Sequence, residues 1–204
     1  MFTAALDTSV LWPSLQRDFL LSLAIEGAYR PTWSSAILDE LEFHEEAKLV
    51  KRGTTRAEAA ARASALVAAM RREFADAEVE GWEPLEGTFG LPDHDDEHVV
   101  AAAVIAGAGA IVTENFKDFP SDRIPPSIQV LSARDFARNA VALNPQYALA
   151  AVQEIARRSG RHGEELTVNS ILDVLRDRYG MIEAVEMMVD VSDEQSSSGR
   201  PENG

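Results

Sequence analysis

Two short apolar runs decide the fold, FTAAL at Phe2–Leu6 and AIVT at Ala110–Thr113. The first run stops at Asp7, and the second stops before Glu114 and Asn115. A short continuous apolar run that ends in polar residues is typical of a strand buried on both faces. Helical patterns fill the chain between the two runs, and strands that alternate with helices predict a parallel sheet covered by helices on both faces.

Further elements extend this pattern on both sides of the two runs. Two more strands are predicted, at Pro31–Trp33 and Ser127–Leu131. The predicted helices span Gln16–Gly27, Ser35–Val50, Ala57–Phe74 and Asp96–Ala106. Thr55 and Glu58 have the spacing of a capping box at the start of the third helix. Together these elements predict an α/β domain over residues 1–138.

The chain after the last predicted strand is helical only. Asn144 followed by Pro145 is a helix-start signal, and Thr167 can cap a second helix. An apolar stripe at helical spacing follows at Met181, Val185 and Met188. We therefore predict an all-helical appendage at residues 139–190. Ser, Glu, Gly and Pro dominate the last residues, which predicts a disordered tail at residues 191–204.

Composition narrows the chemistry. The 204 residues include no cysteine, which excludes disulfides, thiolate metal sites and cysteine nucleophiles. Only four histidines are present against 34 Asp and Glu, so carboxylates are the main metal ligands available. The N-terminal MFTAALDTSV has no basic segment before a long apolar run, which predicts a cytoplasmic protein. The most apolar stretch, Val99–Val112, is too short to span a bilayer, so no membrane role is expected.

Charge is unevenly placed along the chain. The net charge is -15, which opposes nucleic-acid binding unless basic residues cluster locally or a metal is bound. Residues 47–72 carry seven basic residues and one acid, whereas residues 73–98 carry ten acids and no Lys or Arg. A basic helix beside an acidic hollow is the arrangement of a metal-dependent nuclease, which separates phosphate binding from metal binding.

Four oxygen-bearing side chains are expected to converge. Asp7 and Asn115 follow two strands of the predicted sheet, and the carboxyl ends of parallel strands share one edge. Glu40 lies in the helix after the second strand, and Asp96 starts the helix that leads to the Ala110 strand. Carboxylates brought together repel one another unless a cation lies among them. Mg²⁺ or Mn²⁺ suits such a ligand set.

Four segments, in this order and spacing, resemble the PIN domain, and most closely the VapC toxins of bacterial toxin–antitoxin pairs. They are DTSVL at Asp7–Leu11, SAILDEL at Ser35–Leu41, PDHDDEHV at Pro92–Val99 and TENFKDF at Thr113–Phe119. The resemblance covers about residues 1–136 and implies a PIN-like three-layer sandwich built on a parallel sheet. It does not account for the helical appendage.

The resemblance implies site residues position by position. Asp7, Glu40 and Asp96 match the metal-binding acids of the family. The fourth position, an acid in many members, is Asn115, which offers a carbonyl oxygen without charge. Asp118, three residues further, can compensate as a metal ligand.

The implied activity is that of an endoribonuclease that uses one or two Mg²⁺ or Mn²⁺ ions. Metal-activated water would attack a phosphodiester of single-stranded or loop RNA and leave a 5′-phosphate and a 3′-hydroxyl. Thr113 resembles the hydroxyl that orients this water, and completes a catalytic set with Asp7, Glu40, Asp96 and Asn115. The resemblance also implies a small cognate antitoxin, which would block the acidic groove, and a homodimer.

Other interpretations stay open at several positions. Crowding of acids on one helix makes Asp39 or Glu42 an alternative to Glu40, and Asp93 or Asp95 competes with Asp96. A phosphatase with Asp7 as nucleophile would need a second acid two residues on, where the chain has serine. A receiver-type binding module would need an aspartate at the end of a middle strand, and this chain shows no such aspartate. A PIN-like scaffold with impaired catalysis, which binds metal or RNA without cleavage, is the remaining alternative.

Basic and histidine residues complete the candidates. The residues predicted to bind RNA are Lys48, Lys51, Arg52 and Arg56. His44 lies four residues after Glu40, on the same helix face, where it can touch substrate. His94 and His98 are expected on the surface of the loop and helix around them.

Overall fold

The computed structural model describes residues 1–160 and 165–198. Their contacts divide the chain into two compact units. The first unit comprises Met1–Ser14 and Arg30–Ser132, and the second comprises Leu15–Tyr29 and the chain from Ala133 onward. All strands of the described residues belong to the first unit.

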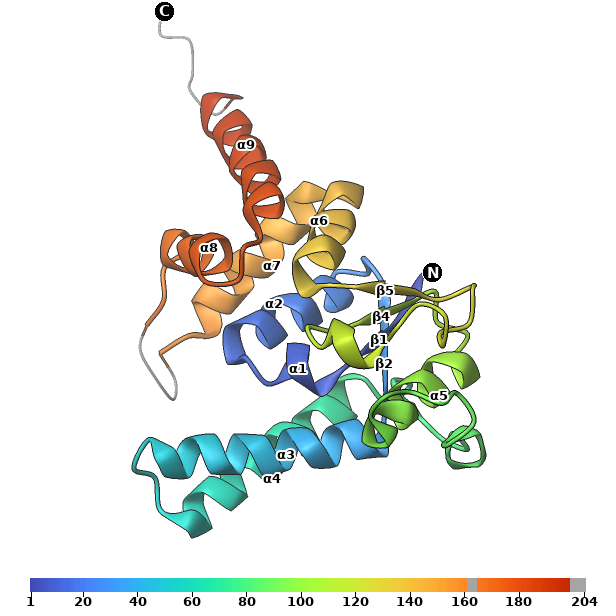
Figure 1. Ribbon diagram of the computed structural model, residues 1–204. Helices are drawn as coiled ribbons and strands as arrows, with labels where there is room; N and C mark the ends of the chain where they lie inside the picture. The colour runs from blue at the N-terminus through green and yellow to red at the C-terminus, as the bar shows by residue number, and fades with distance from the viewer. Residues whose placement is uncertain (161–164, 199–204) are drawn as a thin grey trace, which may run out of the picture. The chain divides into compact units, whose positions relative to one another are not determined.

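The first unit is built on five parallel strands in the order β3-β2-β1-β4-β5 (Figure 1). The strands are β1 (Thr3–Leu6), β2 (Arg30–Ser34), β3 (Glu78–Val79), β4 (Ala110–Val112) and β5 (Gln129–Leu131). Its α-helices are α1 (Thr8–Leu11), α3 (Ser35–Lys51), α4 (Arg56–Glu73) and α5 (Glu97–Ile105). Short 3-10 helices are η1 (Glu83–Leu85), η2 (His94–Asp96) and η3 (Phe116–Asp118). The central strand β1 therefore pairs with β2 on one side and β4 on the other.

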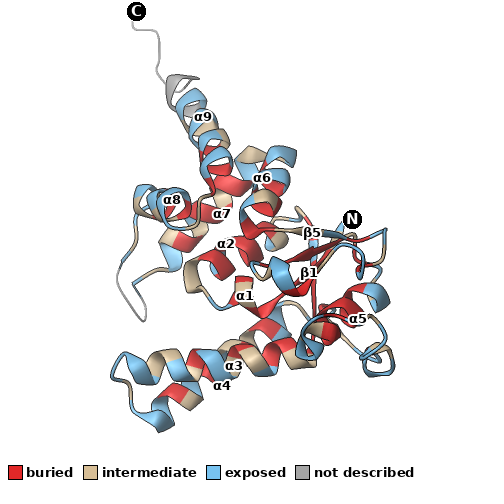
Figure 2. Cartoon of the chain, in the orientation of Figure 1, coloured by how far each residue is buried: buried red, intermediate tan, exposed pale blue. Residues whose placement is uncertain are grey.

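The core of this unit lies around β1 and β4, where the apolar runs of the sequence predict it. Ala5 pairs with Thr32 of β2 and with Ile111 of β4, and the apolar residues of β1 and β4 are fully buried (Figure 2). α5 packs against β1, β2 and β4. Its small residues Ala101–Ala103 are fully buried, which lets the helix approach the sheet closely.

The second unit is all-helical. It contains α2 (Ser14–Ile25, all but its first residue), α6 (Ala133–Leu143), α7 (Pro145–Arg158), α8 (Val168–Asp177) and α9 (Ile182–Ser198). The Tyr29 ring meets Phe136 edge-on at 4.7 Å, and the Tyr29 hydroxyl donates to the Leu20 carbonyl at 2.9 Å. A ring that buries its bulk and satisfies its hydroxyl is well suited to join α2 to α6.

Several helix boundaries follow the predicted caps. The Asn144 side chain accepts from the Tyr147 amide at 3.2 Å, and Pro145 opens α7. Thr167 and Ser170 form a capping box at the start of α8. The stripe at Met181, Val185 and Met188 is buried, as its spacing predicts.

The predicted α/β fold, with a parallel sheet and a helical C-terminal region, is confirmed. The contact-based units differ from the predicted division in one respect, because α2 lies in the helical unit. The boundary at residues 138 and 139 thus stays a prediction. α9 continues beyond Val191, where the tail was predicted to begin, because an established helix extends at little cost per residue. Residues 199–204 lie outside the described residues.

Across residues 1–160 and 165–198, none of the helices is both long enough and apolar enough to cross a membrane.

Candidate metal centre

The site begins where β1 and β4 end side by side. Leu6 pairs with Val112, and the Asp7 amide donates to the Val112 carbonyl at 3.0 Å. Asp7 and Thr113 therefore leave the sheet at the same edge, and both are buried. Parallel pairing thus brings together two residues that lie more than a hundred positions apart in the sequence.

Two hydroxyls hold the Asp7 carboxylate. The Ser9 hydroxyl donates to Asp7 Oδ2 at 2.6 Å, and the Thr113 hydroxyl donates to the same oxygen at 2.7 Å. Thr113 Oγ1 also accepts from the Asn115 amide at 2.9 Å, and Ser9 Oγ accepts from the Glu114 amide at 3.0 Å. Hydroxyls that accept from the backbone while donating to one carboxylate oxygen fix its orientation.

Glu40 is fixed by partners on two other elements. The Ser34 hydroxyl caps α3 by accepting from the Ile37 amide at 3.1 Å, and Glu40 follows in the second turn. The Thr8 hydroxyl donates to Glu40 Oε2 at 2.6 Å. His98 Nε2, from α5, lies 3.1 Å from Glu40 Oε1.

The histidine beside Glu40 is itself oriented. His98 is buried, and its Nδ1 lies 2.9 Å from Ser34 Oγ. Because Ser34 Oγ already accepts from the backbone, its own proton can be donated to Nδ1, and Nε2 then carries the N–H that faces Glu40. Burial by itself would raise the pKa of Glu40, but the hydrogen bonds from His98 and Thr8 outweigh it and lower that pKa below its usual value. Glu40 is therefore held as a carboxylate.

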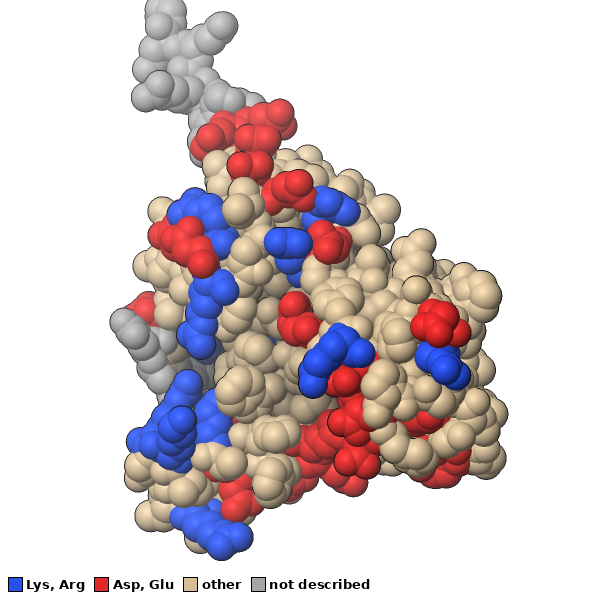
Figure 3. Space-filling model, viewed as in Figure 1, with Lys and Arg blue, Asp and Glu red and all other residues tan. Residues whose placement is uncertain are grey.

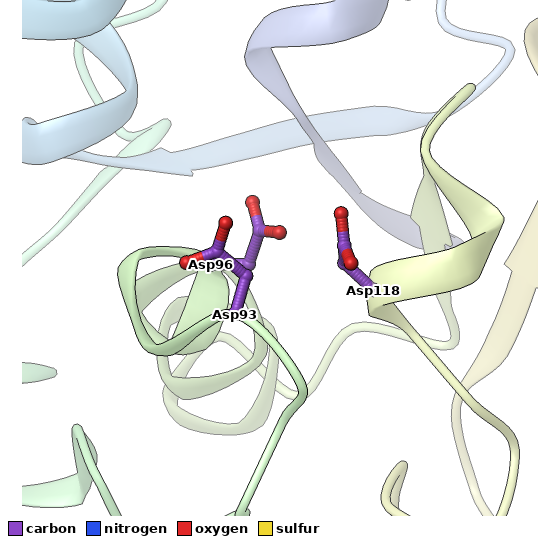
Figure 4. Close-up of side chains that lie close together, drawn as sticks. All are labelled: Asp93, Asp96 and Asp118. Atoms are coloured by element: carbon purple, nitrogen blue, oxygen red, sulfur yellow. The ribbon is translucent and has the colours of Figure 1, made fainter.

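Three aspartates form the second part of the site. Asp93, Asp96 and Asp118 each offer an oxygen, and these oxygens all lie within 4.8 Å of one another (Figure 4). Asp93 caps η2 by accepting from the Asp95 amide at 3.0 Å, which places Asp96 at the junction of η2 and α5. Asp118 comes from η3, which follows β4. Carboxylate oxygens at this separation fit a divalent cation such as Mg²⁺ or Mn²⁺.

Asp96 is the electrostatic centre of the whole cluster. Burial, and then the charges of Asp7, Asp93, Asp118 and Glu40, raise the pKa of Asp96 to about 7. These four carboxylates all act on Asp96, so the two parts of the site form one acidic cluster. A cation in this cluster would relieve the repulsion that otherwise favours a proton on Asp96.

Asn115 joins the cluster through its amide nitrogen. Its Nδ2 donates to Asp96 Oδ2 at 3.3 Å. The neutral residue at the fourth position thus supports an aspartate by hydrogen bonding.

The predicted acidic residues thus lie together, whereas the predicted RNA-binding residues lie elsewhere in the first unit. Lys48, Lys51 and Arg52 occupy the second half of α3 and its end, and Arg56 begins α4. Lys48 pairs with Glu45 and donates to Ser14 Oγ at 3.0 Å. Arg56 lies 3.4 Å from a carboxylate oxygen of Glu46. Acidic side chains gather between α3 and α5, and basic ones gather toward the far end of α3 and α4 (Figure 3).

Sequence reasoning named Thr113 but missed three other residues that hold the carboxylates, Thr8, Ser9 and His98. The expectation that His98 lies on the surface is wrong, because α5 is buried on nearly all sides and His98 faces Ser34 and Glu40. Thr8 and Ser9 gave no signal beyond their position after Asp7. Only the fold of α1 back over the sheet edge brings their hydroxyls to Glu40 and Asp7.

Glu97 is another missed residue, with a different role. Its carboxylate accepts from the backbone amides of Phe89, Gly90 and Leu91 at 2.7 to 3.1 Å. Burial would raise the pKa of Glu97, but these hydrogen bonds outweigh it and lower the pKa. Glu97 thus anchors the loop that leads to Asp93 and lies outside the acidic cluster.

One protein-family model matches this chain. A model described as the PIN domain matches residues 3–117, which include Asp7, Glu40, Asp96 and Asn115. No curated protein and no solved structure gives a significant match. The matched segment covers more than half of the chain, from the first residue of β1 to the second residue of η3, and ends one residue before Asp118. The chain therefore belongs to the PIN domain family.

Proposed function

We propose that this protein is a Mg²⁺- or Mn²⁺-dependent endoribonuclease that cleaves single-stranded or loop RNA. The observation that carries the proposal is the acidic cluster around Asp96, where four other carboxylates from the first unit act on Asp96. PIN domains are generally metal-dependent nucleases, and this chain belongs to that family. A cluster of this charge is costly for the fold alone, which favours a role in cation binding.

The residues of such a site would have two roles, holding the metal ions and orienting the carboxylates that hold them. Asp96, Asp118 and Asp7 would hold one or two ions, and Glu40 would complete the ligand set. Ser9 and Thr113 orient Asp7, while Thr8 and His98 orient Glu40. A bound divalent cation would supply neutralisation of phosphate charge and acidification of water. The products expected of this hydrolysis are a 5′-phosphate and a 3′-hydroxyl.

Metal-dependent cleavage is tested with purified protein and total cellular RNA in Mg²⁺ or Mn²⁺. We expect discrete fragments with either metal and none with EDTA. Asp96→Asn should abolish cleavage, whereas Asp95→Asn should leave it intact, because Asp95 is exposed and outside the triad. Cleavage that persists in EDTA, or in Asp96→Asn, would exclude the proposed site.

We also propose that the enzyme is the toxin of a toxin–antitoxin pair, cytoplasmic and homodimeric. The support is the order and spacing of the four motif segments, which most resemble VapC toxins. The partner would be a small antitoxin that inserts a basic side chain among the carboxylates. Expression of the chain alone should arrest growth, and the product of a neighbouring small gene should restore it. Growth arrest by Asp96→Asn, or a monomeric mass in solution, would count against this finer assignment.

A catalytically impaired scaffold is the second candidate. The observation that favours it is the amide of Asn115, which donates to Asp96 where many PIN domains carry another acid. Asn115→Asp separates the two candidates, because it restores the charge without changing the size of the side chain. A wild-type chain that binds Mn²⁺ but cleaves RNA only as Asn115→Asp would establish the scaffold.

A further inference from the structure

Trp12 is an exposed aromatic residue of the first unit. It lies beside α3, further along that helix than Glu40. The chain has three tryptophans, of which Trp33 and Trp82 are buried and Trp12 is 44% exposed. Trp12 follows directly on α1, four residues after Thr8. An exposed indole that is fixed in place offers a flat apolar surface at small entropic cost.

Contacts between the α1 segment and α3 fix the position of this indole. Trp12 Nε1 donates to the His44 carbonyl at 3.3 Å. Lys48 Nζ donates to the Trp12 carbonyl at 3.3 Å and lies 5.7 Å from the ring centroid. Since Thr8 donates to Glu40 one turn earlier, the α1 segment follows α3 away from the site. The indole is thereby held level with the second and third turns after Glu40.

The stripe of α3 beside Trp12 changes charge along its length. Glu40, His44, Lys48 and Lys51 follow one another at spacings of four, four and three residues, so they share one helix face. At about 1.5 Å per residue, Lys48 lies about 12 Å along the axis from Glu40. The stripe is acidic at the metal centre and basic beyond it, and Figure 3 shows this separation over α3.

A flat aromatic surface between an acidic metal centre and basic side chains matches one ligand chemistry. Single-stranded nucleic acids are bound by aromatic rings that stack on unpaired bases and by basic groups that contact the backbone phosphates. A duplex keeps its bases stacked on one another and has none to offer. The basic end of the stripe supplies the charge complementarity that the net charge of the chain otherwise opposes.

We propose that Trp12 stacks on an unpaired base of single-stranded RNA, while the exposed Lys51 contacts a phosphate next to it and Lys48, paired with Glu45, holds the Trp12 segment in place. This inference rests on the proposed ribonuclease function and adds the element that positions the strand. A base held on Trp12 places the neighbouring phosphate toward Glu40 and the acidic cluster. Trp12 is therefore a substrate-binding residue, and its Nε1 hydrogen bond to His44 positions the ring.

The test measures binding of a fluorescently labelled single-stranded RNA of mixed sequence, by anisotropy, in EDTA so that no cleavage occurs. Trp12→Leu should weaken binding about tenfold or more, because it removes the stacking surface. Trp12→Phe should stay close to wild type, because it keeps an aromatic face and loses only the hydrogen bond to His44. Tyr147→Leu, at an exposed aromatic of the second unit, serves as the matched control and should have no effect.

Two outcomes would overturn the inference. Equal loss in Trp12→Phe and Trp12→Leu would show that the hydrogen bond, and thus the local fold, is what matters. Unchanged RNA binding in Trp12→Leu would exclude Trp12 as a stacking surface. As a second readout, single-stranded RNA should quench the tryptophan fluorescence, and the quenching reports on Trp12 because Trp33 and Trp82 are buried. A duplex of the same sequence should not quench it, because a duplex offers no unpaired base.

The design separates this inference from the ribonuclease itself. If wild-type protein and Trp12→Leu cleave RNA equally and bind RNA equally, the proposal that Trp12 stacks on a base is wrong and the proposed ribonuclease activity stands. If RNA binding depends on Trp12 but no metal-dependent cleavage occurs, the ribonuclease fails and the binding surface stands.

Discussion

The two parts of the acidic cluster differ in what faces their carboxylates. Asp7 and Glu40 each receive two hydrogen bonds from Ser9, Thr113, Thr8 or His98. Asp93, Asp96 and Asp118 face one another instead, and Asp96 receives a long hydrogen bond from Asn115. The first part is held by hydrogen bonds from the protein, whereas the three carboxylates of the second part exceed the charge of Lys117, an exposed cation whose Nζ lies 3.3 Å from Asp118 Oδ2. Metal dependence should therefore concentrate at Asp96.

Removing one carboxylate from each part gives the sharpest contrast. Asp7→Ala and Asp96→Asn should both reduce RNA cleavage by about 100-fold or more. In metal-free protein, Asp7→Ala should lower the free energy of unfolding by about 1–3 kcal/mol, because the buried Thr113 hydroxyl and the half-buried Ser9 hydroxyl lose their acceptor. Asp96→Asn should leave the melting temperature unchanged or higher, because repulsion is relieved. Thermal unfolding in EDTA measures both, and a sharp fall in Asp96→Asn alone would contradict the comparison.

The raised pKa of Asp96 predicts the pH dependence of the second part. Its folded-state pKa, about 7, lies above its ordinary value of 3.8, so the folded metal-free protein holds this proton more tightly than the unfolded chain. The stability gained from that proton is fully present below pH 3.8 and is lost as the pH rises through 7. Mn²⁺ affinity should rise by up to about tenfold per pH unit below pH 7, because metal and proton compete.

Titration with Mn²⁺ at a series of pH values measures this dependence. Asp96→Asn removes the group that titrates and should flatten the profile. An affinity profile in wild type that is already flat between pH 5 and 7 would contradict the assignment.

His98 tests the first part of the site through its positioning role. His98→Leu should weaken Mn²⁺ binding about tenfold, because the residues that orient a metal ligand contribute on this scale. His98→Gln can still present an amide donor near the position of Nε2 and should recover part of the affinity. Isothermal titration with Mn²⁺ compares the variants. If Gln and Leu lower the affinity equally, the histidine fills space and does not orient Glu40.

Glu97 gives the smallest effect on metal binding and serves as a neighbouring control. Glu97→Gln should lower stability by about 1–3 kcal/mol, because its amide group turns a donor toward backbone donors. Mn²⁺ affinity should change little, since Glu97 contacts the Phe89–Leu91 backbone and not the cluster. Its lowered pKa means that the stability it provides is present above about pH 4.5 and is lost as the pH falls through the folded-state pKa. Chemical denaturation at pH 7 and at lower pH tests both statements.

Sequence patterns were most informative where one local rule decides the structure. The apolar runs at β1 and β4, the Asn144 and Thr167 caps and the Met181 stripe all follow from short-range spacing. β3 was not predicted, because two residues, Glu78 and Val79, carry no periodicity. The strand exists because β2 offers it a partner.

At the candidate site, chain order alone identified which polar residues end the strands. It could not choose among neighbouring acids, because that choice depends on three-dimensional placement. Asp93 and Asp95 are both exposed, but only Asp93 lies within reach of Asp96 and Asp118. The burial of His98 follows from packing of α5 on the sheet, which a surface pattern for one helix does not reveal.

The central claim is that the carboxylates around Asp96 form a divalent-cation site. The most direct measurement is a Mn²⁺ titration of EDTA-stripped protein at pH 7, followed by calorimetry or by the electron paramagnetic resonance signal of free Mn²⁺. We predict saturable binding of one or two ions in wild type and in Asp95→Asn, and binding weakened by about 100-fold in Asp96→Asn. No Mn²⁺ binding by the wild type, or equal binding by Asp96→Asn, would contradict the account.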